Sequence, residues 1–125
     1  KQKWLIEMKR LVIKIGAKME ADLKEIFADP KKALPNTHTL YLKDAQELYE
    51  LLSPKRIELL RFVLNEFNEK KTITEISKKL HRKQEAISRD ANVLSKHELI
   101  QKIRDKQKTY LKPVYGSLEI KLSGN

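Results

Sequence analysis

Two helical patterns separated by only four residues constrain the fold of this chain more than any other feature. The first begins with Thr72 and Glu75, which have the spacing of a capping box. Residues 81–84 separate it from the second pattern. Helices joined so tightly must cross at a steep angle. The buried faces are expected to hold Ile73, Ile76, Ser77 and Leu80 in the first helix and Ile87, Ala91 and Leu94 in the second.

Further patterns flank this pair on both sides. Ser53 before Pro54 is typical of an N-cap and a first helical turn, and predicts a helix over residues 54–67. Residues 99–112 alternate as a hairpin does, and the absence of glycine at its tip predicts a longer or irregular hairpin. Residues 118–122 alternate cleanly and are expected to add an edge strand. The buried face of the first helix is expected to hold Ile57, Leu60, Val63, Leu64 and Phe67.

The N-terminal part carries mixed patterns. Apolar residues alternate first, then repeat with helical spacing up to Pro30, where a breaker-rich loop follows. The predicted order is a strand over residues 11–15, a helix over 19–27, a strand over 38–42 and a helix over 44–52. Four aromatic residues are expected in the core or at a dimer contact; these are Trp4, Phe27, Tyr41 and Tyr49.

The charge of the chain favours a polyanionic partner. Lys and Arg number 27 against 17 acids, which gives a net charge of +10 and a pI near 9.7. The excess is concentrated in residues 78–112, which hold eleven basic and four acidic residues. A turn, a helix and a hairpin carry these charges, so together they can contact one stretch of backbone.

The order of helix, helix, turn, helix and hairpin is that of a winged helix-turn-helix. Within it, three segments resemble the small MarR- and ArsR-like predicted transcriptional regulators of prokaryotes; they are residues 52–60, 73–80 and 86–94. The resemblance covers residues 44–122. It implies that residues 84–95 are the recognition helix and residues 102–112 the wing.

Two positions depart from the family pattern. The turn has His81 where glycine is usual and Lys83 where a capping Asp or Ser is usual. His81 is therefore expected to adopt a left-handed or bridge conformation. We expect an α+β protein with an N-terminal strand-helix-strand extension in residues 1–43, which makes the dimer contact together with the last strand, and a winged helix-turn-helix DNA-binding domain in residues 44–125.

The candidate site lies on the outer face of the recognition helix and on the surrounding basic residues. With Ile87 in the core, the helical period turns polar side chains outward, and their types suit base edges. The base-contact candidates are Gln84, Glu85, Ser88, Arg89 and Asn92. The phosphate-backbone candidates are Lys78, Lys79, Arg82, Lys83, Lys96, Lys102, Arg104, Lys106, Lys108 and Lys112.

The chain lacks the residues that several classes of function require. The chain has no cysteine, and its three histidines, His38, His81 and His97, share no ligand spacing. It has no nucleophile elbow and no glycine-rich phosphate loop. We therefore expect no enzyme activity, no metal and no cofactor. No apolar run is long enough for a bilayer, and we expect a cytoplasmic protein.

These observations favour a sequence-specific regulator of double-stranded DNA, a repressor acting as a homodimer. Two alternatives remain open at the level of sequence. One is an architectural or replication-type DNA binder with little sequence preference. The other is an antitoxin-like module whose first 43 residues bind a protein partner. The operator and any small-molecule effector are not specified by these patterns.

Overall fold

The structure, a computed structural model, describes residues 8–65 and 71–122 and divides into two units. One unit runs from Leu51 to Tyr115, and the other joins the chain up to Glu50 with the chain from Gly116 onward. The division thus falls after Glu50 rather than after residue 43, and the last strand belongs with the N-terminal part. The reason is strand pairing, because the last strand forms its hydrogen bonds with the first.

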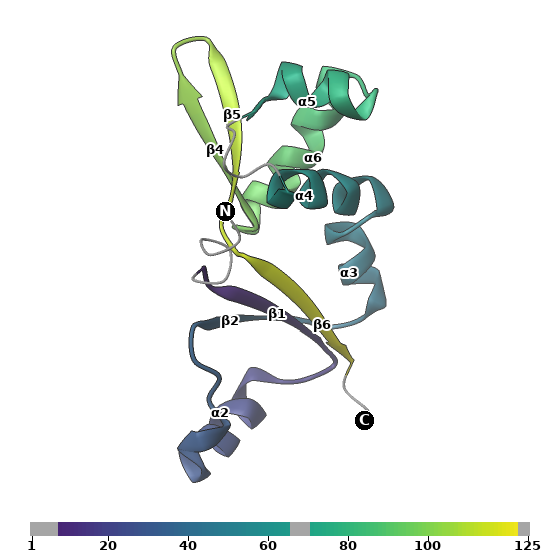
Figure 1. Cartoon of the computed structure of the whole chain (residues 1–125). Helices are drawn as coiled ribbons and strands as arrows, with labels where there is room; N and C mark the ends of the chain where they lie inside the picture. The colour runs from purple at the N-terminus through teal and green to yellow at the C-terminus, as the bar shows by residue number, and fades with distance from the viewer. Residues whose placement is uncertain (1–7, 66–70, 123–125) are drawn as a thin grey trace. The chain divides into compact units, whose positions relative to one another are not determined.

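The unit from Leu51 to Tyr115 is a winged helix, as expected. Its elements are α4 (Pro54–Asn65), β3 (Lys71–Thr72), α5 (Ile73–Leu80), α6 (Gln84–Lys96), β4 (Ile100–Asp105) and β5 (Lys108–Pro113). The strands form an antiparallel sheet in the order β3-β5-β4, and the β4-β5 hairpin is the wing (Figure 1). The two-residue strand β3 was not predicted, because two residues are too few to show alternation.

The core of this unit confirms the stripe of α6, confirms that of α5 in part and corrects that of α4. On α5, Ile76 and Ser77 are buried, while Ile73 and Leu80 are only half-buried. Ile76, Ile87 and Leu94 are at most 1% exposed. On α4, Ile57 was expected inside but is 41% exposed, and Leu59 is fully buried instead. Leu60 and Val63 are buried as expected. Arg56, the residue before Ile57, donates from its guanidinium to the Leu51 carbonyl and to Asp90. Phe67 lies outside the described residues.

The structure confirms the prediction for one turn of the winged helix and corrects the prediction for the other. His81 is left-handed, with φ of 53°, as expected where glycine is usual, and α6 begins at Gln84 without a side-chain cap from Lys83. The wing turn is short instead of long or irregular, because Asp105 pairs directly with Lys108. Lys106 makes this possible by adopting φ of 58° itself.

The other unit is built on a parallel sheet. Its elements are β1 (Arg10–Ile15), α2 (Met19–Ala28), the 3-10 helix η1 (Pro30–Lys32), β2 (Thr37–Leu42), α3 (Ala45–Leu51) and β6 (Ser117–Leu122). The strand order is β2-β1-β6, so the predicted strands and the predicted edge strand are confirmed (Figure 1). Leu11, Val12 and Ile13 of the central strand are almost fully buried. The pairing of β6 with β1 bridges more than a hundred residues of sequence.

A polar cluster fastens α2 to the sheet. Lys14 Nζ lies 2.5 Å from Asp22 Oδ2, and the Tyr41 hydroxyl donates to the same oxygen at 2.7 Å. These hydrogen bonds, led by that from Lys14, lower the pKa of Asp22. Burial, together with the hydrogen bond to Asp22, raises the pKa of Tyr41 to about 12. The charges of the cluster thus balance within the unit.

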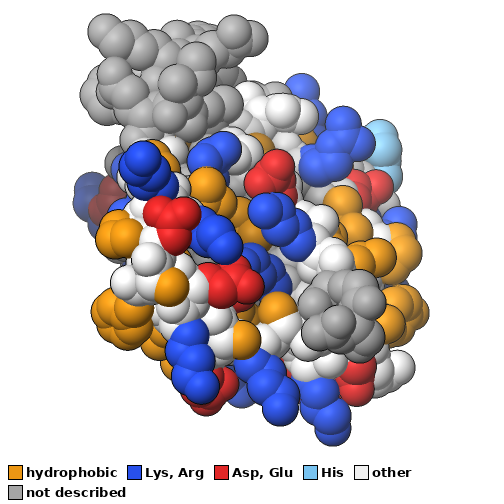
Figure 2. Space-filling view, turned by 90° about the horizontal axis from the view of Figure 1, so that it is seen from below, with side chains coloured by type: hydrophobic (Ala, Val, Ile, Leu, Met, Phe, Trp, Pro, Cys, Tyr) orange, Lys and Arg blue, Asp and Glu red, His pale blue; other side chains and the backbone are white. Residues whose placement is uncertain are grey.

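The apolar face of α2 is exposed rather than buried. Met19, Leu23 and Phe27 are 52%, 42% and 81% exposed. Figure 2 shows the face seen from below Figure 1, where hydrophobic side chains lie among basic and acidic ones. Phe27 and Tyr49 are therefore outside the core of the described chain, and Trp4 lies outside the described residues. No helix among the described residues is long and apolar enough to cross a membrane.

Candidate functional site

A groove within the winged helix is bounded by three elements. It has a volume of about 450 Å³ and lies where the first turn of α5 and the first half of α6 meet the tip of the wing. Its lining residues are Thr72, Ile73, Thr74, Glu75, Gln84, Ser88, Arg104, Gln107, Lys108 and Thr109. All but one of these side chains are polar, so the groove can form hydrogen bonds with a ligand along its whole length.

The outer face of α6 contains all five base-contact candidates. Gln84 and Ser88 line the groove, while Glu85, Arg89 and Asn92 are exposed beside it. The opposite face is in the core, where Ile87, Ala91 and Leu94 are fully buried. The helical period therefore brings these candidates together, as the sequence predicted.

One of the five base-contact candidates, Asn92, already contacts the wing. Lys102 Nζ donates to Asn92 Oδ1 at 2.5 Å. Reading an adenine requires both the carbonyl and the amide of an Asn side chain. Because the Asn92 carbonyl oxygen already accepts a hydrogen bond from Lys102, Asn92 is less suited to recognising a base than the other candidates. The same hydrogen bond holds Lys102 beside α6.

The two faces of the wing separate its basic residues. Cross-strand partners share a face, and Lys102 pairs with buried Leu111 while Arg104 pairs with Thr109. Lys112 pairs with Gln101 and Lys108 with Asp105, so both lie on the opposite face, although Lys108 at the tip still lines the groove. Lys102 and Arg104 accordingly lie on the helix side of the wing, whereas Lys112 is directed away from the groove.

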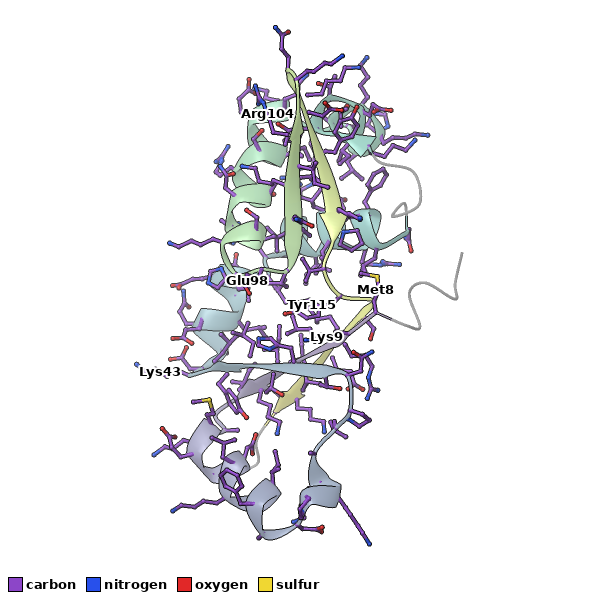
Figure 3. All side chains as sticks on the ribbon, turned by 90° about the vertical axis from the view of Figure 1, so that its left-hand side faces the viewer. Met8, Lys9, Lys43, Glu98, Arg104 and Tyr115 are labelled. Atoms are coloured by element: carbon purple, nitrogen blue, oxygen red, sulfur yellow. The ribbon has the colours of Figure 1, made fainter. Side chains whose placement is uncertain are left out.

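Arg104 is held in place near the tip of the wing. Its Nη1 donates to Thr109 Oγ1 at 3.2 Å, and its Nε donates to the Lys106 carbonyl at 3.3 Å. Figure 3 shows Arg104 toward the tip and Glu98 at the base of the hairpin. The guanidinium remains exposed, so a positively charged fork is positioned on the wall of the groove.

Arg82 has an internal role in place of the phosphate contact expected from sequence. Its Nη2 lies 2.5 Å from Asp90 Oδ2, and its Nη1 donates to the Lys55 carbonyl. Arg56 Nη1 binds the other Asp90 oxygen at 3.1 Å. The side chains of Arg82 and Asp90 are only 11% and 9% exposed. This triad of Arg56, Arg82 and Asp90 joins α4, the turn and α6. Its signal in the sequence is Asp90, an acid next to the buried stripe of α6.

The remaining basic candidates lie at different distances from the groove. Lys106 and Lys108 are exposed at the wing tip, and Lys83 is exposed immediately before α6. Lys78 and Lys79 are exposed in the last turn of α5. Lys96, at the other end of α6, is roughly 18 Å from Gln84 along the helix axis. The residues nearest the groove are therefore Lys83, Lys102, Arg104, Lys106 and Lys108.

The first turn of α5 is part of the site, although sequence reasoning gave it only a structural role. Thr72 Oγ1 accepts from the Glu75 N–H, and Glu75 Oε1 accepts from the Thr72 N–H, each at 3.1 Å. These hydrogen bonds lower the pKa of Glu75, and the bond from the Thr72 backbone N–H has the largest effect. The capping box predicted from the sequence thus also shapes one wall of the groove. That wall includes Thr74, and Gln107 and Thr109 of the wing were likewise missed.

Thr72→Ala should destabilise the protein by about 1 kcal/mol through loss of this cap. The pKa of Glu75 is lower in the folded protein than in the unfolded chain. The contribution of Glu75 to folding stability is therefore present above the unfolded pKa and is lost as the pH falls through the folded pKa. Urea unfolding of both proteins should therefore differ more at neutral pH than at acidic pH. An equal difference at both values would assign the effect to the cap bond from the Glu75 N–H, which does not depend on pH, and to packing of the threonine methyl group.

One comparison with known protein families matches the region that carries the groove. A family model described as HVO_A0114 matches residues 51–120, more than half of the chain. No curated protein matches the chain.

Three solved structures are similar to parts of the chain. HlyU from Vibrio cholerae N16961 is 18% identical with a TM-score of 0.46, over 56% of this chain and 74% of that one. A transcriptional regulator HlyU from Vibrio vulnificus CMCP6 is 19% identical with a TM-score of 0.47, over 74% and 82%. A MepR mutant from a multidrug-resistant S. aureus clinical isolate is 15% identical with a TM-score of 0.48, over 77% and 66%.

Proposed function

This chain belongs to the HVO_A0114 family, and we propose that its winged helix binds double-stranded DNA as a sequence-specific transcription regulator. The observation that carries this proposal is the groove, where the exposed face of α6 stands beside positively charged wing residues. An α-helix fits the major groove of B-DNA, and the wing can then follow the adjacent backbone.

The side chains around the groove suit two different tasks. On α6, Arg89 can bind guanine with its planar fork, and Gln84 can bind adenine. Lys106 and Lys108 are flexible point charges at the wing tip, which suit phosphate oxygens. The site therefore combines base reading from the helix with positioning by the wing.

We further propose that the regulator is a homodimeric repressor. One recognition helix reads only a few base pairs, so a specific site needs two of them related by a two-fold axis. A dimer bound across a promoter would block access to the DNA it covers.

Selection of bound duplexes from a random pool tests the proposal. A single enriched inverted repeat, bound at least about a thousandfold more tightly than random duplex, is the expected result. A ratio below about 10 would instead identify an architectural binder. Absence of DNA binding, together with a small protein that co-purifies, would favour an antitoxin-like module.

Arg89→Ala separates base reading from backbone positioning. On the selected site it should cost about 1 to 3 kcal/mol, and on random duplex much less, because only a cognate base satisfies the guanidinium. Fluorescence anisotropy on the two duplexes measures both values.

The matched controls for this variant are Lys106→Ala and Lys108→Ala. Each should weaken both duplexes about equally and reduce the salt slope by roughly one unit for each phosphate that is no longer neutralised. If Arg89→Ala also weakens both duplexes by the same factor, Arg89 binds phosphate and the assigned reading face is wrong.

A further inference from the structure

The strand β6 has an open edge. Among the described residues it is the terminal strand of the order β2-β1-β6, and β1 is its hydrogen-bonded neighbour. Its apolar side chains are unusually exposed, with Ile120 at 43% and Leu122 at 78%. An exposed apolar edge presents unpaired backbone groups and favours pairing with another strand.

The sequence of β6 is complementary to itself. Residues 118–122 read Leu-Glu-Ile-Lys-Leu, which is symmetric about Ile120 except that the two flanking charges are opposite. When two copies run antiparallel about Ile120, Glu119 of each lies opposite Lys121 of the other, and Leu118 lies opposite Leu122. Opposite charges and apolar pairs at such positions stabilise a sheet.

The charges around Lys121 within one copy also favour an acidic residue of a second copy beside it. In the register of the sheet, Lys121 lies next to Lys14, a like charge. Like charges at paired positions destabilise a sheet, and Asp22, which is bonded to Lys14, is the acid near them. A Glu119 from a second copy would add a negative charge on the open side of Lys121.

We propose that β6 pairs antiparallel with β6 of a second copy of this chain, centred on Ile120, so that the two three-stranded sheets become one continuous sheet. This interface is isologous, since the same residues contribute from both copies. It covers Ile120 with its symmetry mate and places each Leu122 against a Leu118. The opposite edge of the sheet, β2, has no acidic or basic pair along Thr37–Leu42 that could be complementary in this way.

This inference rests on the homodimer of the proposed function but not on DNA binding. A dimer that forms through β6 and does not bind DNA would contradict the regulator alone. A DNA-binding dimer that forms elsewhere would contradict the β6 interface alone.

Site-specific cross-linking tests the register directly, because the chain contains no cysteine. Residues opposite each other in an antiparallel pair have Cα atoms about 4.5 or 5.5 Å apart, within the range of a disulfide. Ile120→Cys in the full chain should therefore form covalent dimers under mild oxidation without DNA. Leu118→Cys is the matched control, because the two copies of residue 118 lie about 13 Å apart.

The double variant Leu118→Cys and Leu122→Cys should again form covalent dimers, since these positions face each other. If Ile120→Cys cross-links no faster than Leu118→Cys, the proposed register is wrong. A dimer that instead cross-links through Phe27→Cys on α2 would move the interface to the exposed face of that helix.

Reversal of the charges provides a second, independent measurement. Lys121→Glu should weaken dimerisation about tenfold, because Glu119 of each copy then lies opposite an acid. Adding Glu119→Lys to this variant should restore dimerisation by re-forming opposite pairs. Sedimentation measures the dimer constant, and circular dichroism establishes that each variant is folded. Equal dimerisation of all three proteins would overturn the interface.

Discussion

Asp90→Ala should lower the free energy of unfolding by about 3 kcal/mol at neutral pH, the low end of the range for breaking a buried ion pair. Asp90 is the shared acceptor of Arg56 and Arg82, and the side chains of the three residues are only 9% to 18% exposed. Without the carboxylate, two guanidinium groups remain largely buried next to each other and repel. Urea unfolding followed by circular dichroism measures the loss.

Asp105→Ala is the matched control for this variant. Asp105 is an exposed acid on the wing of the same unit, so its removal should change stability by no more than about 0.5 kcal/mol. A loss below about 1 kcal/mol for Asp90→Ala would mean that water or other acceptors replace the carboxylate. The triad would then not be what holds the turn to α4 and α6.

DNA affinity should fall by about a hundredfold to a thousandfold per subunit between about 50 and 200 mM salt, if about 4 to 6 phosphates are neutralised. The counter-ions released from those phosphates cause this dependence. The basic residues nearest the groove account for the expected number, since Lys83, Lys102, Arg104, Lys106 and Lys108 are exposed there. Fluorescence anisotropy at several salt concentrations gives the slope.

Lys112→Ala is the control that the structure adds to this experiment. Lys112 lies on the face of the wing directed away from α6, so its removal should leave the salt slope unchanged, whereas Lys106→Ala should reduce it. Affinity that does not depend on salt would contradict binding through phosphates altogether. An equal effect of both variants would mean that DNA contacts both faces of the wing.

Local features of the winged helix were determined by the sequence alone. The capping box of Thr72 and Glu75 starts α5, and the apolar stripe of α6 selects its buried face. These features depend on residues within four positions of each other, so propensity and periodicity reveal them. The left-handed His81 was implied by the family resemblance, because His81 stands where that family usually has glycine.

Other features depend on which distant residue becomes a neighbour. Arg82 was expected to face a phosphate and instead binds Asp90, because the crossing of the helices brings an acid within reach. Lys112 was grouped with the other wing residues, but the register of β4 and β5 places it on the opposite face. Charge counts do not distinguish these outcomes, since a basic residue has the same sequence signal in either place.

The largest difference concerns β6. Its alternation predicted a strand and an open edge, but nothing local to residues 117–122 selects β1 as the neighbour. Backbone hydrogen bonds are the same for every strand, so pairing is decided by where the chain between the strands leads and by which faces must be buried. The sequence by itself therefore determined the positions of the helices and the charge of this protein. Only the tertiary structure decided that its first and last strands share one sheet.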